Sequence, residues 1–500
     1  MQRVYAAELG LDRLLELSTG ADLLPSKEVL QHARSSLIPA ISKEGLGLSN
    51  TVKHLKEDVV PALNLASQLP NYYGFITGGV TPVAALADNI VTAYDQNVQV
   101  HLPEETIATE VEDRALRMLC ELLDFGPTEW PHKTFTTGAT ASNVLGLACG
   151  REFVIAEAAR RTKKGPVNVG DLGLAKALRL CGLDDIRILT TVPHSSLGKA
   201  ASITGIGRDS ITLVGLPNAP HKFDMTKLQR ILQERTSGYI VAISCAEVNT
   251  GLFATSSAAE MLELRELCDK YGAWIHVDGA FGLLVRVLED HQYLNIRAGC
   301  DGIQFADSIT GDAHKLLNVP YDCGFFLGKH RALAENVFRN SNAAYLNVGA
   351  TDTSFIASPL NIGIENSRRF RALPVYASLT AYGRRGYRDM LERQVKLARG
   401  IARFILRHSE YDLLPNLEVD DERRLDSIYI IVLFRAKDDS LNKDLVKHVN
   451  ATKKIYVSGT AWTGAPACRF AVSNWQVDVD RDLQLVTDVL DRVALAASHA

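Results

Sequence analysis

Residues 307–324 read DSITGDAHKLLNVPYDCG and place Lys315 directly after His314, behind a short apolar strand. A lysine held at such a position can use its amine to bind an aldehyde covalently. The alternative is a surface lysine, which the apolar Leu316 and Leu317 that follow argue against. The stretch therefore predicts a site at which Lys315 reacts with a carbonyl compound.

A second stretch, residues 274–282 (WIHVDGAFG), is a hydrophobic strand that ends in one carboxylate, Asp278. A carboxylate between apolar neighbours needs a partner to offset its desolvation, unless it is a solvated turn residue or a helix cap. Lys315 and Asp278 together provide what pyridoxal 5'-phosphate (PLP) requires. The amine forms the Schiff base, and the carboxylate keeps the pyridine nitrogen protonated.

The composition is that of an ordinary globular chain. Of its 500 residues 46% are hydrophobic, and the formal net charge of −4 leaves no basic excess for nucleic acid. The eight cysteines lie far apart without a CxxC pair, which favours neither disulfides nor a metal site. The sequence has no apolar signal core and no run of about 18 apolar residues. We therefore expect a cytoplasmic protein that binds neither nucleic acid nor membrane.

Short apolar strands alternate with segments of helical length between residues 134 and 328, which predicts a mostly parallel sheet flanked by helices. The polar, helical pattern of residues 21–69 predicts an N-terminal arm, and the C-terminal pattern predicts a small α+β domain. The domain boundaries we expect are 1–95, 96–355 and 356–500. The strands expected in the large sheet are 135–137, 187–190, 212–215, 240–244, 275–277 and 302–305. Those expected at the C-terminus, after a helix over 378–408, are 427–434, 454–458 and 467–473.

Residues 134–143 (TFTTGATASN) put small and hydroxyl residues where a strand turns into a helix. The free N–H groups and the positive end of the helix dipole favour an anion at such a turn. An ordinary strand–helix turn has a similar composition, so the turn alone is a weak signal. With Lys315 downstream, we predict a phosphate site here.

The sequence around these residues resembles the group II PLP-dependent amino-acid decarboxylases, whose members act on aromatic amino acids, glutamate, histidine or diaminobutyrate. The matching pieces run from residue 70 to residue 475 in the family's order. The resemblance implies a fold-type I PLP enzyme that converts an L-amino acid to its amine and CO2. It also implies a homodimer, because the family's active sites form at the subunit interface.

His194, in residues 192–200 (VPHSSLGKA), resembles the family's histidine that stacks on the cofactor ring and reaches the substrate as a proton donor. A lone histidine before a helix is otherwise a cap or a surface residue. The resemblance makes Lys315, His194 and Asp278 the candidate catalytic residues. The further residues that it implies bind PLP are Ala139, Thr140, Glu247, Ala280, Asp312 and His314.

Two charged residues leave alternatives open. Residues 245–251 (CAEVNTG) match the family except that Glu247 replaces a neutral Thr or Asn near the cofactor's phenolic oxygen. A carboxylate there must share a proton to avoid repulsion, so Glu247 either tunes the cofactor or turns aside. Arg469 either binds a substrate carboxylate or forms an interior ion pair.

Residues 359–373 (PLNIGIENSRRFRAL) resemble the segment behind the family's mobile catalytic loop. In many members a loop tyrosine protonates the carbanion after CO2 leaves, and here its place falls on Pro359, with Tyr345, Phe355 and Ser358 nearby. Loss of that tyrosine is associated in the family with oxygen-dependent aldehyde formation. We therefore expect some oxygen uptake beside CO2 release. The alternatives are an aldehyde-forming oxidative deaminase, an aminotransferase, a C–C lyase, or a paralogue that binds PLP without turnover.

The substrate is expected to be an aromatic or otherwise uncharged amino acid. No arginine or lysine is evidently placed in the sequence to hold an acidic side chain. The residues available to line an apolar pocket are Tyr72, Tyr73, Phe75 and Ile76.

Overall fold

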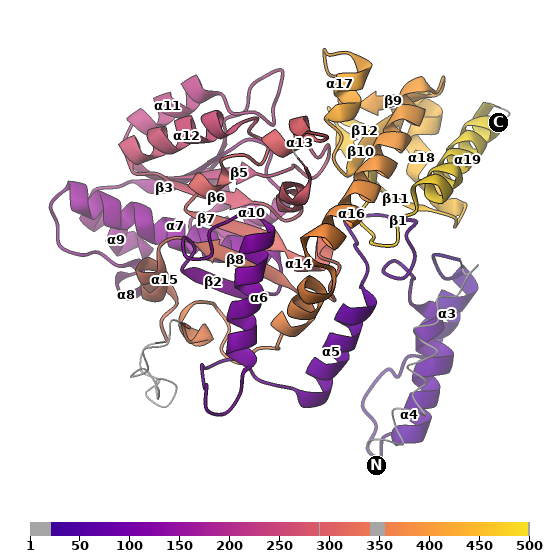
Figure 1. Ribbon diagram of the computed structural model, residues 1–500, viewed down its shortest axis with the longest axis horizontal. Helices are drawn as coiled ribbons and strands as arrows, with labels where there is room; N and C mark the ends of the chain where they lie inside the picture. The colour runs from indigo at the N-terminus through magenta and orange to yellow at the C-terminus, as the bar shows by residue number, and fades with distance from the viewer. Residues whose placement is uncertain (1–21, 290, 341–355, 499–500) are drawn as a thin grey trace.

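The structure is a computed structural model that describes residues 22–289, 291–340 and 356–498. Within these ranges the strands form two sheets (Figure 1). A seven-stranded sheet, in the order β2-β8-β7-β6-β5-β3-β4, makes the larger part. A five-stranded sheet, in the order β1-β11-β12-β10-β9, makes the smaller part near the C-terminus.

The large sheet is mostly parallel, as the sequence predicted. β3 to β7 run parallel, and only β8 is reversed, pairing antiparallel with β7 and β2. Every residue of the central strand β5 is buried, which is typical of a sheet covered on both faces. The strands are β2 (His132–Thr136), β3 (Asp185–Thr190), β4 (Ile211–Leu213), β5 (Ser237–Ser244), β6 (Trp274–Asp278), β7 (Ser308–Asp312) and β8 (Gly324–Gly328).

Helices lie on both faces of this sheet (Figure 1). They are α6 (Ala108–Leu122), α7 (Ala139–Arg161), α8 (Val169–Leu172), α9 (Leu174–Cys181), α10 (Ser195–Ile203), α11 (Met225–Gln233), α12 (Ala258–Tyr271), α13 (Leu294–Ala298), α14 (Ala313–Leu316) and α15 (Arg331–Phe338). Asp224 caps α11 through its side chain, as its sequence predicted.

The small sheet combines one strand from the N-terminal part of the chain with four from the C-terminal part. Its antiparallel strands are β9 (Tyr411–Leu414), β10 (Ile431–Ala436), β11 (Tyr456–Trp462) and β12 (Ala465–Ala471), and the short β1 (Tyr72–Tyr73) pairs parallel with β11. Phe75 and Ile76, which follow β1, line a cavity at the edge of the large sheet. The remaining helices are α3 (Lys27–Ser36), α4 (Leu48–His54), α5 (Pro82–Tyr94), α16 (Ala372–Arg407), α17 (Asp421–Asp426), α18 (Asp439–Ala451) and α19 (Val479–Ser498).

Three local predictions were wrong. Residues 303–305 form a 3-10 turn after Gly302, whose φ of 82° favours glycine, and the strand begins only at Ser308. The helix expected over 378–408 begins at Ala372 and is interrupted at Gly383, where φ is 54°. Strands β8 and β9 were not predicted, since each is short and does not alternate in polarity.

All eight cysteines are free and buried. Among the described residues, no helix is both long enough and apolar enough to span a membrane.

Candidate active site

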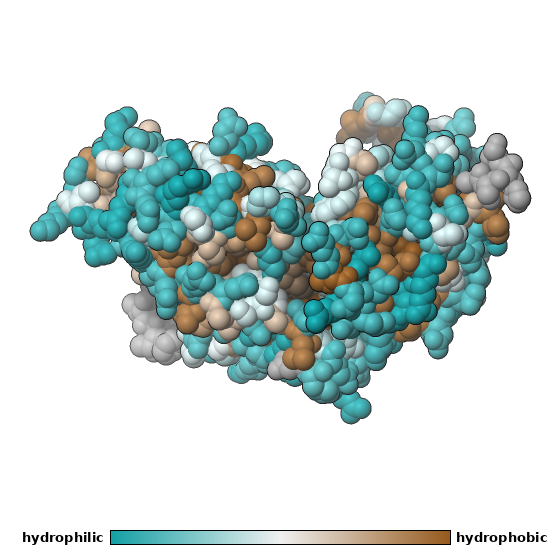
Figure 2. Space-filling model, turned by 90° about the horizontal axis from the view of Figure 1, so that it is seen from above, coloured by the Kyte–Doolittle hydropathy of each residue, from teal (hydrophilic) through white to brown (hydrophobic). Residues whose placement is uncertain are grey.

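A cavity of about 450 Å³ lies at the carboxyl ends of the parallel strands. Register places Ser244, Asp278 and Thr310 side by side on β5, β6 and β7, so the side chains that end these strands converge. Seen from above, the molecule is hollowed between the large and small parts, and hydrophobic side chains gather along the hollow (Figure 2). The nine residues assigned by the sequence all line the cavity: Ala139, Thr140, His194, Glu247, Asp278, Ala280, Asp312, His314 and Lys315.

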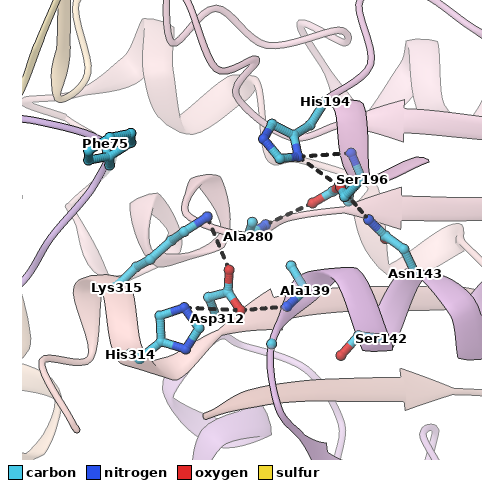
Figure 3. Close-up of polar contacts among 12 residues, drawn as sticks. Phe75, Ala139, Ser142, Asn143, His194, Ser196, Ala280, Asp312, His314 and Lys315 are labelled. Carbon is cyan, nitrogen blue, oxygen red and sulfur yellow. Dashed lines mark hydrogen bonds and ion pairs between the residues drawn. The ribbon is translucent and has the colours of Figure 1, made fainter. Parts of the chain in front are cut away.

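Lys315 extends into this cavity from α14, the single helical turn that follows β7 (Figure 3). Its Nζ lies 3.0 Å from Oδ2 of Asp312 and 5.9 Å from the ring centroid of Phe281. The next two residues, Leu316 and Leu317, are buried and anchor the turn. The amine is therefore held by a packed element and remains open to the cavity.

Asp278 ends β6, and both of its carboxylate oxygens accept hydrogen bonds. Oδ2 accepts from Nδ2 of Asn143 at 2.9 Å, and Oδ1 accepts from the backbone N–H of Ala280 at 3.2 Å. The preceding Val277 is fully buried. The carboxylate is thus fixed from the protein side while it lines the cavity, which suits a partner for a cationic group.

His194 combines the two roles that the sequence left open, because it caps α10 and also lines the cavity. Its Nδ1 accepts from the backbone N–H of Ser196 at 3.2 Å and contacts Oγ of Ser196 at 2.8 Å. Burial lowers the pKa of His194, which favours the neutral ring. Because a backbone N–H can only donate, the proton of the neutral ring is on Nε2.

Asn143, which was not singled out as a site residue, connects Asp278 with His194. Its Nδ2 donates to Asp278 and, at 3.1 Å, to Oγ of Ser196, which in turn bonds His194 (Figure 3). Its Oδ1 lies 2.8 Å from Nε2 of His276. The one signal in the sequence was the position of Asn143, one helical turn after Ala139 in the predicted phosphate turn.

Behind Asn143 the hydrogen bonds continue to the indole of Trp274. Its Nε1 donates to Oγ of Ser308 at 3.0 Å, and Ser308 bonds Nδ1 of His276 at 2.8 Å. Burial lowers the pKa of His276 to about 4, so this ring is neutral. Since the indole can only donate and the carboxylate of Asp278 only accepts, every bond between them has one allowed direction. The network fixes the amide orientation of Asn143 and the tautomer of His276, whereas the tautomer of His194 is fixed by the backbone N–H of Ser196.

Asn143→Ala is expected to lower kcat by about 10- to 100-fold, because outer hydrogen bonds that orient a functional ligand are worth that much. The variant leaves Asp278 with one donor and removes the donor to Ser196. The backbone N–H of Ser196 still fixes the tautomer of His194, so the loss of kcat should reflect the orientation of Asp278. Ser142→Ala is the matched control: Ser142 is buried on the same helical turn but bonds Thr136, away from Asp278. Equal losses of kcat in both variants would refute the role of Asn143.

The predicted phosphate turn forms the start of α7. Thr140 and Ala141 line the cavity in its first turn, where backbone N–H groups have no intrahelical acceptor. The N–H of Ala139 donates to Oδ1 of Asp312 at 2.6 Å. From the lysine segment, the ring of His314 lies against Tyr321, with centroids 4.5 Å apart. The residues predicted to bind the phosphate are therefore adjacent. One of them, Asp312, carries a carboxylate of its own.

Both carboxylate oxygens of Glu247 accept hydrogen bonds from its own turn. Its Oε1 accepts from the N–H and hydroxyl of Thr250, and its Oε2 accepts from the N–H of Asn249 at 2.9 Å. Both oxygens thus stabilise the turn over residues 247–250, although Glu247 still contributes to the cavity wall.

Arg469 lines the cavity and donates to two backbone carbonyls, while its Nε has no hydrogen-bond partner among the described residues. Its Nη1 donates to the carbonyl of Val248 at 2.6 Å, and its Nη2 donates to the carbonyl of Phe75 at 2.7 Å. No salt bridge joins it to another described residue. Burial lowers its pKa. The guanidinium instead holds two loops of the cavity wall together.

Only half of the predicted apolar pocket is correct. Phe75 and Ile76 line the cavity, whereas Tyr72 and Tyr73 do not. As residues of β1, Tyr72 stacks on Tyr456 and Tyr73 packs against Phe470. The pairing with β11 turns both tyrosines into the core of the small part.

The loop predictions fall partly outside the described residues, which exclude Tyr345 and Phe355. Pro359 is buried at the start of a 3-10 turn, and Ser358 Oγ accepts from the N–H of His101; neither lines the cavity. A phenol does reach the cavity from elsewhere. Tyr321, on the lysine segment, lines it; the residue is 57% exposed, and partial desolvation of its hydroxyl raises the pKa, which keeps the phenol protonated. Tyr321 was not predicted as a site residue, because it lies outside the loop that carries the family's tyrosine.

Several known proteins are similar to this chain in sequence. The pyridoxal-dependent decarboxylase conserved domain matches residues 39–421. An L-2,4-diaminobutyrate decarboxylase of Acinetobacter baumannii is 24% identical over 92% of this chain and 87% of its own length. Tyrosine decarboxylase 2 of Arabidopsis thaliana is 28% identical over 81% of this chain and 70% of its own length.

Solved structures share the fold over nearly the whole chain. Oryza sativa TDC, determined with PLP and tryptamine, superposes with a TM-score of 0.79 at 17% identity and covers 99% of this chain and 97% of its own. Rhodiola rosea 4-hydroxyphenylacetaldehyde synthase superposes with a TM-score of 0.78 at 16% identity and the same coverage.

Proposed function

Because the chain belongs to the pyridoxal-dependent decarboxylase family, we propose that it removes CO2 from an aromatic or otherwise uncharged L-amino acid by means of Lys315, Asp278 and His194. The family relation makes it a PLP-dependent amino-acid carboxy-lyase, and its sheet and helices form the fold-type I architecture.

The cavity residues fit PLP at three points. The amine of Lys315 is available to bind an aldehyde, and the carboxylate of Asp278 faces the same cavity from the next strand. His194 lies across from Lys315 with Nε2 protonated (Figure 3). Bound PLP supplies an electron sink for the bond that breaks at the substrate Cα.

Each residue then has one task in the reaction. Lys315 holds the cofactor covalently and releases it to the substrate amine. Asp278 keeps a proton on the ring nitrogen, and its two hydrogen bonds prevent it from turning away. His194 covers the ring and keeps its Nε2 proton available to the substrate carbon.

The environment of Arg469 is the single observation on which the proposed substrate class rests. It is the arginine of the cavity wall, and two of its nitrogens already donate to Val248 and Phe75. Glu247 lies in the same cavity wall, and its carboxylate would repel an acidic side chain that approaches the guanidinium. The remaining wall is apolar, with Phe75, Ile76 and Phe281, so an uncharged or aromatic side chain is favoured.

Phe75 is built into this wall under constraint. Its φ of 59° is unusual for a non-glycine residue, and its side chain is 64% exposed. The N–H donates to Oγ of Ser458 at 2.9 Å, and the carbonyl accepts from Arg469. These two bonds hold the ring at the cavity, where it can contact the substrate side chain.

The decisive test is a panel of L-amino acids with mass-spectrometric detection of amine, aldehyde and CO2. We expect one or a few aromatic or uncharged substrates to give CO2 in an amount equal to the sum of amine and aldehyde, with amine as the main product. Turnover confined to aspartate or glutamate would contradict the substrate class, and products without CO2 would contradict the reaction.

Tyr321→Phe is expected to increase oxygen uptake and the aldehyde share of the product severalfold. Pro359 and Ser358 do not line the cavity, whereas Tyr321 lies among the cavity side chains that can donate a proton, together with His194 and Lys315. A slower proton transfer leaves the carbanion exposed to oxygen, as an aldehyde-forming reaction requires. Product ratios under air and under argon measure the effect. An unchanged ratio would exclude Tyr321 as the proton donor.

A homodimer is part of the proposal. On α5, Leu86, Ile90 and Tyr94 are 61%, 43% and 74% exposed and are spaced four residues apart, so they form one apolar stripe. The opposite face of α5 is buried against this chain. A stripe of this kind favours burial by a second copy. Light scattering during gel filtration should give the mass of two chains, and Ile90→Glu should reduce it.

A further inference from the structure

The anion site at the start of α7 already holds a carboxylate from the chain itself. Oδ1 of Asp312 accepts from the N–H of Ala139 at 2.6 Å, and Oδ2 pairs with Nζ of Lys315 at 3.0 Å (Figure 3). Asp312 is only 8% exposed. A Cβ built on Gly138 would lie 3.4 Å from Oδ1, so the carboxylate lies in van der Waals range of the turn. Asp312 therefore occupies part of the site that the sequence assigns to a phosphate.

A phosphate that binds at this turn meets Asp312 in two ways. It competes for the N–H of Ala139, and it brings two negative charges close to a carboxylate with little access to water. The ammonium of Lys315 compensates Asp312 while the lysine is free. Once Lys315 has bound an aldehyde covalently, it no longer offers three N–H donors to the carboxylate. Covalent attachment thus weakens the compensation just where the phosphate arrives.

We propose that Asp312 sets the phosphate preference of the cofactor site: its carboxylate opposes the phosphate at the start of α7, and an uncharged residue there would strengthen binding of phosphorylated ligands. This inference rests on the proposed function, since it takes PLP as the ligand. It reverses the supporting role that the family resemblance implied for Asp312. Thr140 and Ala141 remain as phosphate donors in the same turn.

The test compares PLP with pyridoxal, which lacks the phosphate, on the full-length chain after removal of its cofactor. Absorbance titration gives the dissociation constant of each ligand for the wild type and for Asp312→Asn. Loss of the carboxylate also changes the environment of Lys315, but that change affects both ligands alike. The ratio of the two constants therefore isolates the phosphate. We expect the preference for PLP to rise by at least about tenfold, a modest part of the repulsion between close charges.

Two further variants make the result specific. Asp312→Ala, which adds no new donor, should shift the ratio in the same direction. Asp322→Asn removes a carboxylate from the same segment that pairs with Arg371 instead, and it should leave the ratio unchanged. Inorganic phosphate alone should raise the unfolding temperature of Asp312→Ala more than that of the wild type.

The outcomes separate the inference from the function on which it rests. A preference for PLP that stays constant or falls in both Asp312 variants overturns the inference, because the carboxylate then tolerates or assists the phosphate. If neither PLP nor pyridoxal reacts with Lys315 of the wild type, the proposed function fails instead. Equal shifts of the PLP-to-pyridoxal ratio in Asp312→Asn and Asp322→Asn would also overturn the inference about Asp312, since they would indicate only a change in overall charge.

Discussion

Replacement of Lys315 by alanine is expected to abolish turnover, with a fall in kcat of at least about 10⁴-fold, the scale seen when a covalent catalyst is removed. The amine is the nucleophile that the cavity offers from a packed element, 3.0 Å from the carboxylate of Asp312. The fold should persist, because the side chain lines a cavity while the adjacent Leu316 and Leu317 carry the packing. Circular dichroism and steady-state kinetics of the same preparation test both statements.

Lys315→Arg is the matched control, because it keeps a positive charge beside Asp312 but cannot form an imine with the cofactor. It should be as inactive as Lys315→Ala and should bind PLP only reversibly. Borohydride reduction of the wild type, followed by peptide mapping, should place the cofactor on Lys315. Cofactor on another lysine, or an active arginine variant, would end this assignment.

The parts of the site that could be predicted are those whose geometry is determined by a short stretch of sequence. Asp278 and Lys315 each follow an apolar strand, and the parallel pairing of β6 with β7 brings two such strand ends together wherever this sheet forms. The turn before α7 was recognisable for the same reason. A strand, a turn and a helix start are adjacent in sequence, so their composition reports their geometry.

The parts that could not be predicted depend on contacts between distant segments. Tyr72 and Tyr73 have the composition of a pocket wall, but their pairing with β11 is decided by residues near the C-terminus. Arg469 is likewise satisfied by the carbonyls of Val248 and Phe75, from two other segments. Backbone acceptors carry no signature in a sequence. An ion pair was therefore expected where the structure has hydrogen bonds to carbonyls.

Asp278→Asn is expected to lower kcat on the order of 10²- to 10³-fold, the cost of removing one preorganised electrostatic group, while PLP remains bound. Both oxygens of Asp278 accept hydrogen bonds, from Asn143 and from the N–H of Ala280. An amide has one oxygen, so its NH2 group must face one of these two donors. The variant thus loses the charge that holds a proton on the ring nitrogen and also gains a donor–donor contact. Kinetics and the absorbance spectrum of the bound cofactor measure the two effects.

A double variant, Asn143→Asp with Asp278→Asn, distinguishes charge from its position. It restores the net charge of the site and a complementary hydrogen bond between residues 143 and 278, but it moves the carboxylate off the end of β6 into the network of His276 and Ser196. If Asp278 acts on the cofactor directly, the double variant should recover stability without recovering kcat. Recovery of kcat to within about tenfold of the wild type, a difference of 1.4 kcal/mol, would mean that the carboxylate acts through the general field of the cavity. Asp278 would then not be the partner of the ring nitrogen.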